Sequence, residues 1–122
     1  MPRVVHFEIV SDDPEETKEF YQKVFDWKAR KWKGPMDYWF LQSADDKQPG
    51  IEGAFGLRQS PDDTIVDTIS VDDIDKYIEL VKAEGGEIIR PKSPVPGVGW
   101  LVYFRDTEGN SWGMMEDDLS AE

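Results

Sequence analysis

The chain has 122 residues, of which 39% are hydrophobic and 12% aromatic, enough for one domain with a buried core. It contains no cysteine, which excludes disulfides, thiolate nucleophiles and cysteine-ligated zinc. A net charge of −12 would repel a phosphate backbone, so no nucleic-acid partner is expected. No run of about 18 apolar residues and no signal-peptide pattern is present. We therefore expect a cytoplasmic protein without a membrane partner.

The first element is a strand within residues 5–10. Its apolar residues Val5, Phe7 and Ile9 alternate with His6 and Glu8, which is the period of a strand with one face in the core. His6 and Glu8 are expected together on the opposite, more polar face.

A helix follows this strand. Asp13 suits the N-cap, Pro14 the first helical position, and Glu16 lies three residues after the cap, as in a capping box. Four apolar residues then recur at helical spacing and predict a core-facing stripe: Phe20, Tyr21, Val24 and Phe25.

Three further strands are predicted in this half of the chain, at residues 27–33, 38–42 and 50–58. Turn-forming residues separate them. Residues 60–63 read as a linker to the second half.

The second half repeats this order of elements. Asp72 lies 60 residues after Asp12, and Gly113 lies 60 residues after Gly53. A strand places Thr68 on its polar face, and a helix begins near Asp72 and ends at two glycines. Strands are predicted at 87–91, 100–105 and 111–116, with residues 94–99 as a rigid loop.

These residues resemble the vicinal-oxygen-chelate superfamily, which includes glyoxalases, bleomycin-resistance proteins and dioxygenases. The resemblance is carried by the strand with His6, by the aromatic helix at residues 20–27, by the proline- and glycine-rich loop at residues 90–99 and by the turn at residues 104–110. Thr107 stands where the family usually has proline.

The resemblance implies an α+β fold in which two βαβββ modules form a half-barrel. It predicts a single domain over residues 1–122, with module one at 1–59 and module two at 64–119. It also implies a small-molecule ligand in the concave face and a homodimer. Members of the family isomerise, cleave or oxygenate substrates, or only sequester them, so the fold alone does not name an activity.

The family's metal ligands lie on the first and last strands of each module. By this resemblance His6 matches a ligand position, whereas Val66, Gly53 and Gly113 do not. A divalent metal therefore requires a rebuilt site from His6, Glu8 and Glu52. Glu52 lies one residue before the expected position, so it would face away unless a bulge turns it.

Two other interpretations of His6 stay open. It can be a strand histidine that is hydrogen-bonded to Glu8 or to a main-chain carbonyl, or it can contact a bound small molecule without metal. Glu8 is the candidate catalytic residue, as a general acid or base with a raised pKa.

Strand aromatics supply candidate pocket walls, and Trp39 and Trp100 are the two that we select. The predicted ligand-binding set is His6, Glu8, Trp39, Thr68 and Trp100. The basic residues Lys28, Arg30, Lys31 and Lys33 fit a solvated edge strand better than an anion site.

Three functions remain. The first is a glyoxalase-like protein that binds an unidentified small molecule with a degenerate metal site. The second is a divalent-metal-dependent lyase or dioxygenase that uses His6 with Glu8 or Glu52. The third is a non-catalytic, dimeric partner-binding protein.

Overall fold

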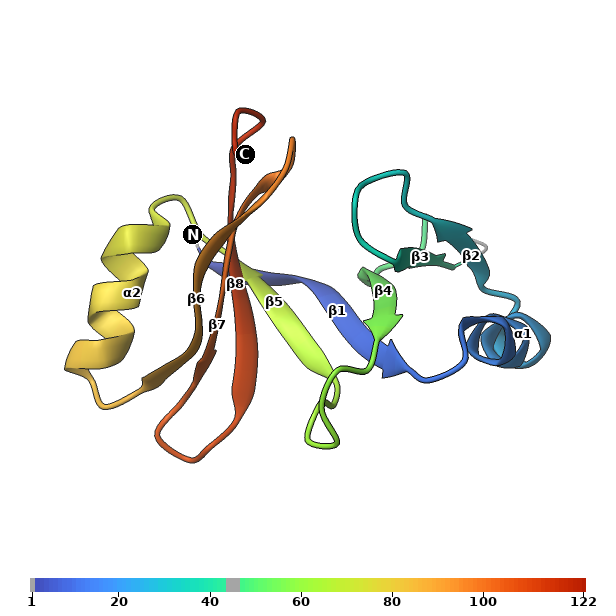
Figure 1. Ribbon diagram of the computed structural model, residues 1–122, viewed down its shortest axis with the longest axis horizontal. Coiled ribbons are helices and arrows are strands. Elements are labelled where there is room, and N and C mark those ends of the chain that lie inside the picture. The colour runs from blue at the N-terminus through green and yellow to red at the C-terminus, as the bar shows by residue number, and fades with distance from the viewer. Residues whose placement is uncertain (1, 44–46) are drawn as a thin grey trace. The chain divides into compact units, whose positions relative to one another are not determined.

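The computed structural model describes residues 2–43 and 47–122, and it has the α+β architecture that the sequence predicts (Figure 1). The chain forms two compact units. The first unit is residues 6–65, and the second is residues 66–122 with the first five residues. Strand β1 (Arg3–Ser11) starts in the second unit and continues through the first. The repeated order of strand, helix and three strands is confirmed.

The described residues of the first unit form one helix and four strands. Besides β1, these are α1 (Pro14–Phe25), β2 (Lys28–Lys31), β3 (Tyr38–Gln42) and β4 (Glu52–Leu57). The strands lie in the order β2-β3-β4-β1. β1 is parallel to β4, and the β2–β3 and β3–β4 pairs are antiparallel. β2 is thus the edge strand of this unit.

Helix α1 begins as its capping residues predict. The Asp13 carboxylate accepts a hydrogen bond from the Glu16 N–H at 3.3 Å, so one of the free donors of the first turn is satisfied. The helix ends at Asp26, whose φ of 59° lies in the left-handed region. That conformation stops the helix before Trp27 and β2.

The strand register separates two faces of the first unit. Ile9 pairs with Phe55, and Phe55 pairs with Trp39, so these side chains share one face with the buried Leu41. Tyr21 of α1 packs against this face and closes the core. Residues of the opposite parity face away from this core.

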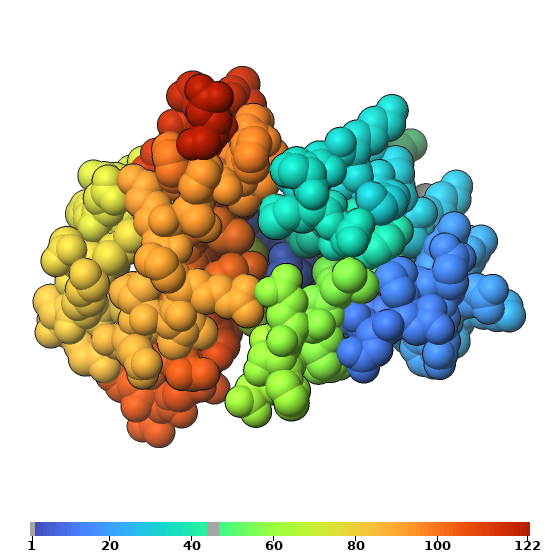
Figure 2. Space-filling model, viewed as in Figure 1, coloured from blue at the N-terminus to red at the C-terminus, as the bar shows by residue number. Residues whose placement is uncertain are grey.

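The apolar stripe of α1 packs on the core only at Tyr21. Phe20, Val24 and Phe25 are more than half exposed, so the prediction that all four residues face the core was wrong. The α1 segment, blue in Figure 2, forms part of the surface of the first unit. Tyr21 stacks on Trp27 at 5.4 Å between ring centroids, and this contact anchors the helix.

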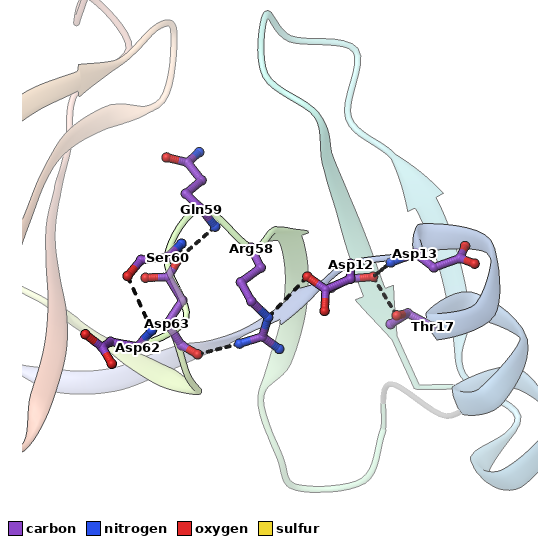
Figure 3. A network of polar contacts seen from close by, with 9 residues as sticks. Asp12, Asp13, Thr17, Arg58, Gln59, Ser60, Asp62 and Asp63 are labelled. Carbon is purple, nitrogen blue, oxygen red and sulfur yellow. Dashed lines mark hydrogen bonds and ion pairs between the residues drawn. The ribbon is translucent and has the colours of Figure 1, made fainter.

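A polar network joins the ends of β1 and β4 to the segment after β4 (Figure 3). Arg58 Nε lies 3.3 Å from Asp12 Oδ1, and Arg58 Nη1 donates to the Asp63 carbonyl at 2.7 Å. The Asp63 carboxylate accepts from the Gln59 and Ser60 N–H groups at 2.9 and 3.2 Å. These bonds give residues 58–63 a defined turn.

The second unit repeats the same arrangement. Its elements are β5 (Val66–Ser70), α2 (Ile74–Ala83), β6 (Glu87–Val95), β7 (Gly99–Arg105) and β8 (Ser111–Asp117). The strands lie in the order β5-β8-β7-β6, with β5 parallel to β8. Ile74 of α2 is fully buried in a core with Val71, Val102 and Met114. In the described residues no helix is long and apolar enough to cross a membrane.

Strand β6 is longer than predicted. Pro94 pairs with Trp100 and Val95 pairs with Gly99, so the loop expected at residues 94–99 is shorter and consists of a turn at residues 96–98. Proline, which has no backbone N–H, is compatible with this position because β6 is an edge strand. On the open side of an edge strand no neighbouring strand needs a hydrogen bond from that residue. Gly97, with a φ of 74°, lies in the hairpin turn.

Candidate functional site

Three polar side chains meet on the face of the first unit opposite its core. His6 Nε2 lies 2.9 Å from Tyr38 Oη, and Tyr38 Oη donates to Glu8 Oε2 at 3.1 Å. His6 and Glu8 lie two residues apart on β1, so they share a face, and Tyr38 reaches them from β3. The phenol therefore bridges an imidazole and a carboxylate.

The direction of these hydrogen bonds fixes the proton on His6. Because the single Tyr38 hydroxyl proton points to Glu8, the phenol oxygen accepts from His6, whose Nε2 must carry a proton. In neutral His6 the Nδ1 atom then holds the lone pair. Partial burial lowers the pKa of His6 below its usual value, and the nearby Glu8 charge opposes that shift. Neutral His6 is therefore favoured at physiological pH.

Aromatic rings extend this polar group toward the edge strand. The Tyr38 ring meets Phe40 edge-on at 5.7 Å, and Trp32 meets Tyr38 edge-on at 6.1 Å. The Arg30 guanidinium lies over the Phe40 ring at 5.1 Å. In the register Arg30 pairs with Phe40, Phe40 with Ala54, and Ala54 with Glu8. We call His6, Glu8, Tyr38, Phe40 and Arg30 the polar face.

Glu52 lies on this same face, which corrects our expectation. It pairs directly with His6 in the β1–β4 register, so no bulge is needed to turn it. We expected Glu52 to face away because we matched Gly53 to Gly113, which are 60 residues apart, as Asp12 and Asp72 are. Glu8 pairs with Ala54, and Thr68, the residue equivalent to Glu8 in the second unit, pairs with Gly113. The position equivalent to Gly113 is therefore Ala54, not Gly53. Gly53 belongs to the core face.

The described residues of the first unit, 6–43 and 47–65, do not fit a divalent metal site. Glu52 Oε2 accepts from the Ser43 N–H at 3.2 Å, while Glu8 and His6 both bond Tyr38. Across residues 2–43 and 47–122, no group of three or more histidine, cysteine or acidic side chains is placed to hold a metal ion. A hard divalent ion needs several such donors to converge.

Of the other predicted ligand residues, Trp39 belongs to the first unit, whereas Trp100 and Thr68 belong to the second. Trp39 stacks on Phe55 at 5.2 Å on the core face, because its parity on β3 is opposite to that of Tyr38. Trp100 packs on the core of the second unit and donates from Nε1 to Asp118 at 3.0 Å. Thr68 is 7% exposed in the second unit. The structure thus brings His6 and Glu8 together within the first unit, and it places Trp39 on the other face of that unit.

Tyr38, Phe40 and Arg30 were not among the residues we predicted for the site. A signal for them was present, because period-two alternation places Tyr38 and Phe40 together on the face opposite Trp39 and Leu41. What could not be read was which of the two faces meets the polar side of β1. That assignment depends on the pairing of β3 with β4 and of β4 with β1.

This arrangement can bind and can exchange protons. A carboxylate, a phenol and an imidazole in one hydrogen-bonded chain offer both donors and acceptors to a polar ligand. The rings of Tyr38 and Phe40 are half-buried and offer apolar surface beside these groups. Glu8, bonded to Tyr38, is positioned as an acceptor for a ligand proton.

Comparison with known proteins gives a consistent result. The profile of the Glyoxalase/Bleomycin resistance protein/Dioxygenase superfamily matches residues 3–114. Over 49 residues the chain is 41% identical to a probable chloroplastic lactoylglutathione lyase of Arabidopsis thaliana, a match that covers 39% of this chain and 14% of that protein.

Solved structures share the fold. A hypothetical protein of Bacillus halodurans aligns with a TM-score of 0.71 and 18% identity over 99% of this chain and 98% of that one. A methylmalonyl-CoA epimerase of Streptomyces coelicolor, in complex with 2-nitronate-propionyl-CoA, aligns with a TM-score of 0.69 and 13% identity, covering 98% and 97% of the two chains. At these identities the likeness establishes the fold alone.

Proposed function

Because the chain belongs to the Glyoxalase/Bleomycin resistance protein/Dioxygenase superfamily, we propose that it binds a small organic molecule on the polar face of its first unit. The hydrogen-bonded chain of His6, Tyr38 and Glu8 is the observation that supports this most. A titratable carboxylate and imidazole held by a phenol are not needed for packing, since the core lies on the other side of the sheet. Such groups beside half-buried rings are typical of ligand sites.

The test is a screen of neutral, cationic and anionic small molecules by ligand-observed NMR. Wild type and Tyr38→Phe are compared, because this change removes the bridging hydroxyl and keeps the ring. Glu19→Gln on the exposed side of α1 is the control. We expect ligands that bind wild type and the control about 10-fold more tightly than Tyr38→Phe, the loss of roughly one good hydrogen bond. Ligands indifferent to Tyr38→Phe would refute the site.

A second candidate is proton transfer to and from the bound molecule. The observation behind it is Glu8, which is joined through Tyr38 to the one imidazole of the chain and can act as a general base. Solved structures with the same fold include methylmalonyl-CoA epimerases, so methylmalonyl-CoA is the first compound to test. Deuterium incorporation from D2O at its acidic carbon, lost in Glu8→Gln, would establish the activity. No incorporation would leave a binding protein.

We also propose that two copies associate through α1. Phe20, Val24 and Phe25 are each more than half exposed, and exposed apolar patches mark contact sites. A two-fold pairing would cover the same patch on both copies. Sedimentation velocity should find a dimer for wild type and a monomer for Phe20→Ser. A wild-type protein that stays monomeric at all concentrations contradicts this.

A further inference from the structure

The charge of β2 is opposite to that of the protein. Four cations, Lys28, Arg30, Lys31 and Lys33, lie close together in a chain whose net charge is −12. Strand alternation divides three of them between the two faces. Arg30 pairs with Phe40 and Lys28 with Gln42 on the polar face, whereas Lys31 pairs with Trp39 on the core face.

The cations of the two faces differ in their partners. Lys31 Nζ lies 3.6 Å from Asp37 Oδ1. Neither Arg30 nor Lys28 forms an ion pair with any carboxylate in the part of the chain that the structure describes. The guanidinium of Arg30 is instead held by the Phe40 ring. Arg30 is therefore an oriented cation whose charge is not neutralised.

The distance across the sheet sets the size of a ligand that could use this charge. Arg30, Phe40, Ala54 and Glu8 form one row of cross-strand partners. Three strand spacings of about 4.8 Å separate the β2 and β1 ends of that row by roughly 14 Å. The rings of Phe40 and Tyr38 lie between the two ends. At the β2 end the Arg30 guanidinium lies over the Phe40 ring, and at the β1 end Glu8 accepts from Tyr38 Oη, so a ligand that uses the Arg30 charge lies along these two rings.

We infer that the ligand is a planar organic anion, a carboxylate or a phosphate ester, whose charge is bound by Arg30 and whose ring lies against Phe40 and Tyr38. This inference rests on the proposed function and specifies its ligand class. A guanidinium binds carboxylate or phosphate with two parallel hydrogen bonds. The His6–Tyr38–Glu8 end is acidic and meets the uncharged, hydroxyl- or carbonyl-bearing part of the ligand. An anionic polymer is excluded because the rest of the chain carries excess negative charge.

The test uses benzoate, phenyl phosphate and the uncharged benzamide as probes. Their affinities are measured by chemical-shift titration of isotope-labelled protein. We expect benzoate or phenyl phosphate to bind more tightly than benzamide, and the preferred acid shows which anion the site takes. Arg30→Gln should weaken the acid about 10- to 100-fold, as for a lost charge-assisted hydrogen bond, and leave benzamide unchanged. The affinity of Arg30→Lys for the acid should lie between those of wild type and Arg30→Gln.

Lys31→Gln is the matched control, because it removes the same charge from the same strand on the other face. It should leave all affinities unchanged. Equal losses in Arg30→Gln and Lys31→Gln would mean attraction to net charge alone and would overturn the inference. Benzamide that binds at the polar face as tightly as both benzoate and phenyl phosphate would overturn the anion class and keep the proposed function. No probe binding at that face would overturn both.

Discussion

His6 is the single histidine of the chain, so its imidazole can be followed without assignment ambiguity. Burial lowers its pKa below the ordinary value of 6.5. The unfolded chain therefore takes up a proton on His6 more readily than the folded one. As the pH falls below 6.5, protonation of His6 in the unfolded chain lowers the free energy of unfolding. Above pH 6.5 the contribution of His6 to the free energy of unfolding is constant.

We predict an NMR titration midpoint for His6 below that of a histidine peptide. In His6→Gln the pH dependence of the unfolding free energy should flatten between the two pKa values. A midpoint above 6.5 would mean that the imidazole is solvated or dominated by Glu8.

The Glu8 charge raises the pKa of His6 against the effect of burial. Glu8→Gln removes this charge and keeps a side chain of similar shape, so the pKa of His6 should fall further. The control is Glu19→Gln, an acidic residue exposed on α1, which should leave the His6 titration unchanged. An unaltered His6 midpoint in Glu8→Gln would contradict the close placement of the His6 imidazole and the Glu8 carboxylate on either side of Tyr38 Oη.

In strand β4, the Phe7 ring covers one of the two glycines. A Cβ atom added at Gly53 would collide with the Phe7 ring, whereas one at Gly56 would meet nothing closer than 3.7 Å. Gly53→Ala must therefore shift the Phe7 ring, which packs against the core of the first unit.

We predict that Gly53→Ala lowers the free energy of unfolding by about 1–3 kcal/mol, the usual effect of overpacking. Gly56→Ala on the same strand should be neutral or stabilise by up to about 1 kcal/mol, because alanine costs less backbone entropy than glycine. Chemical denaturation of both variants measures the difference. Equal effects would show that Phe7 does not pack on Gly53.

The elements themselves were largely predictable from local patterns. Period-two alternation, the Asp13 cap and the duplication indicated the order of strands and helices correctly. The length of β6 was missed because proline normally argues against a strand, and only its edge position permits Pro94. The polar face was half predicted: His6 and Glu8 share a strand, but Tyr38 joins them only through strand pairing.

Glu52 shows why register limits such predictions. One residue of offset moves a side chain to the other face of a sheet. The interval that relates Asp12 to Asp72 does not hold in the last strands, where Gly113 corresponds to Ala54. The pairing of β1 with β4 supplied the missing information.

Across the whole molecule, the two units keep one framework and differ in chemistry. The row of Arg30, Phe40, Ala54 and Glu8 in the first unit corresponds to Arg90, Tyr103, Gly113 and Thr68 in the second. Both rows place an arginine over an aromatic ring, at 5.1 and 5.4 Å. The first row ends in a carboxylate that is bonded to a phenol, whereas the second ends in a threonine. In this row of the duplicated fold, the titratable, hydrogen-bonded group of His6, Tyr38 and Glu8 therefore belongs to the first unit.

The proposed ligand site is the polar face of the first unit. Chemical-shift mapping of labelled protein with the tightest ligand from the screen tests it most directly. We predict that the largest changes fall on His6, Glu8, Tyr38 and Phe40, with a shift of the His6 imidazole, and that Tyr38→Phe reduces them. Changes confined to the core face, or to residues around Thr68 in the second unit, would contradict it.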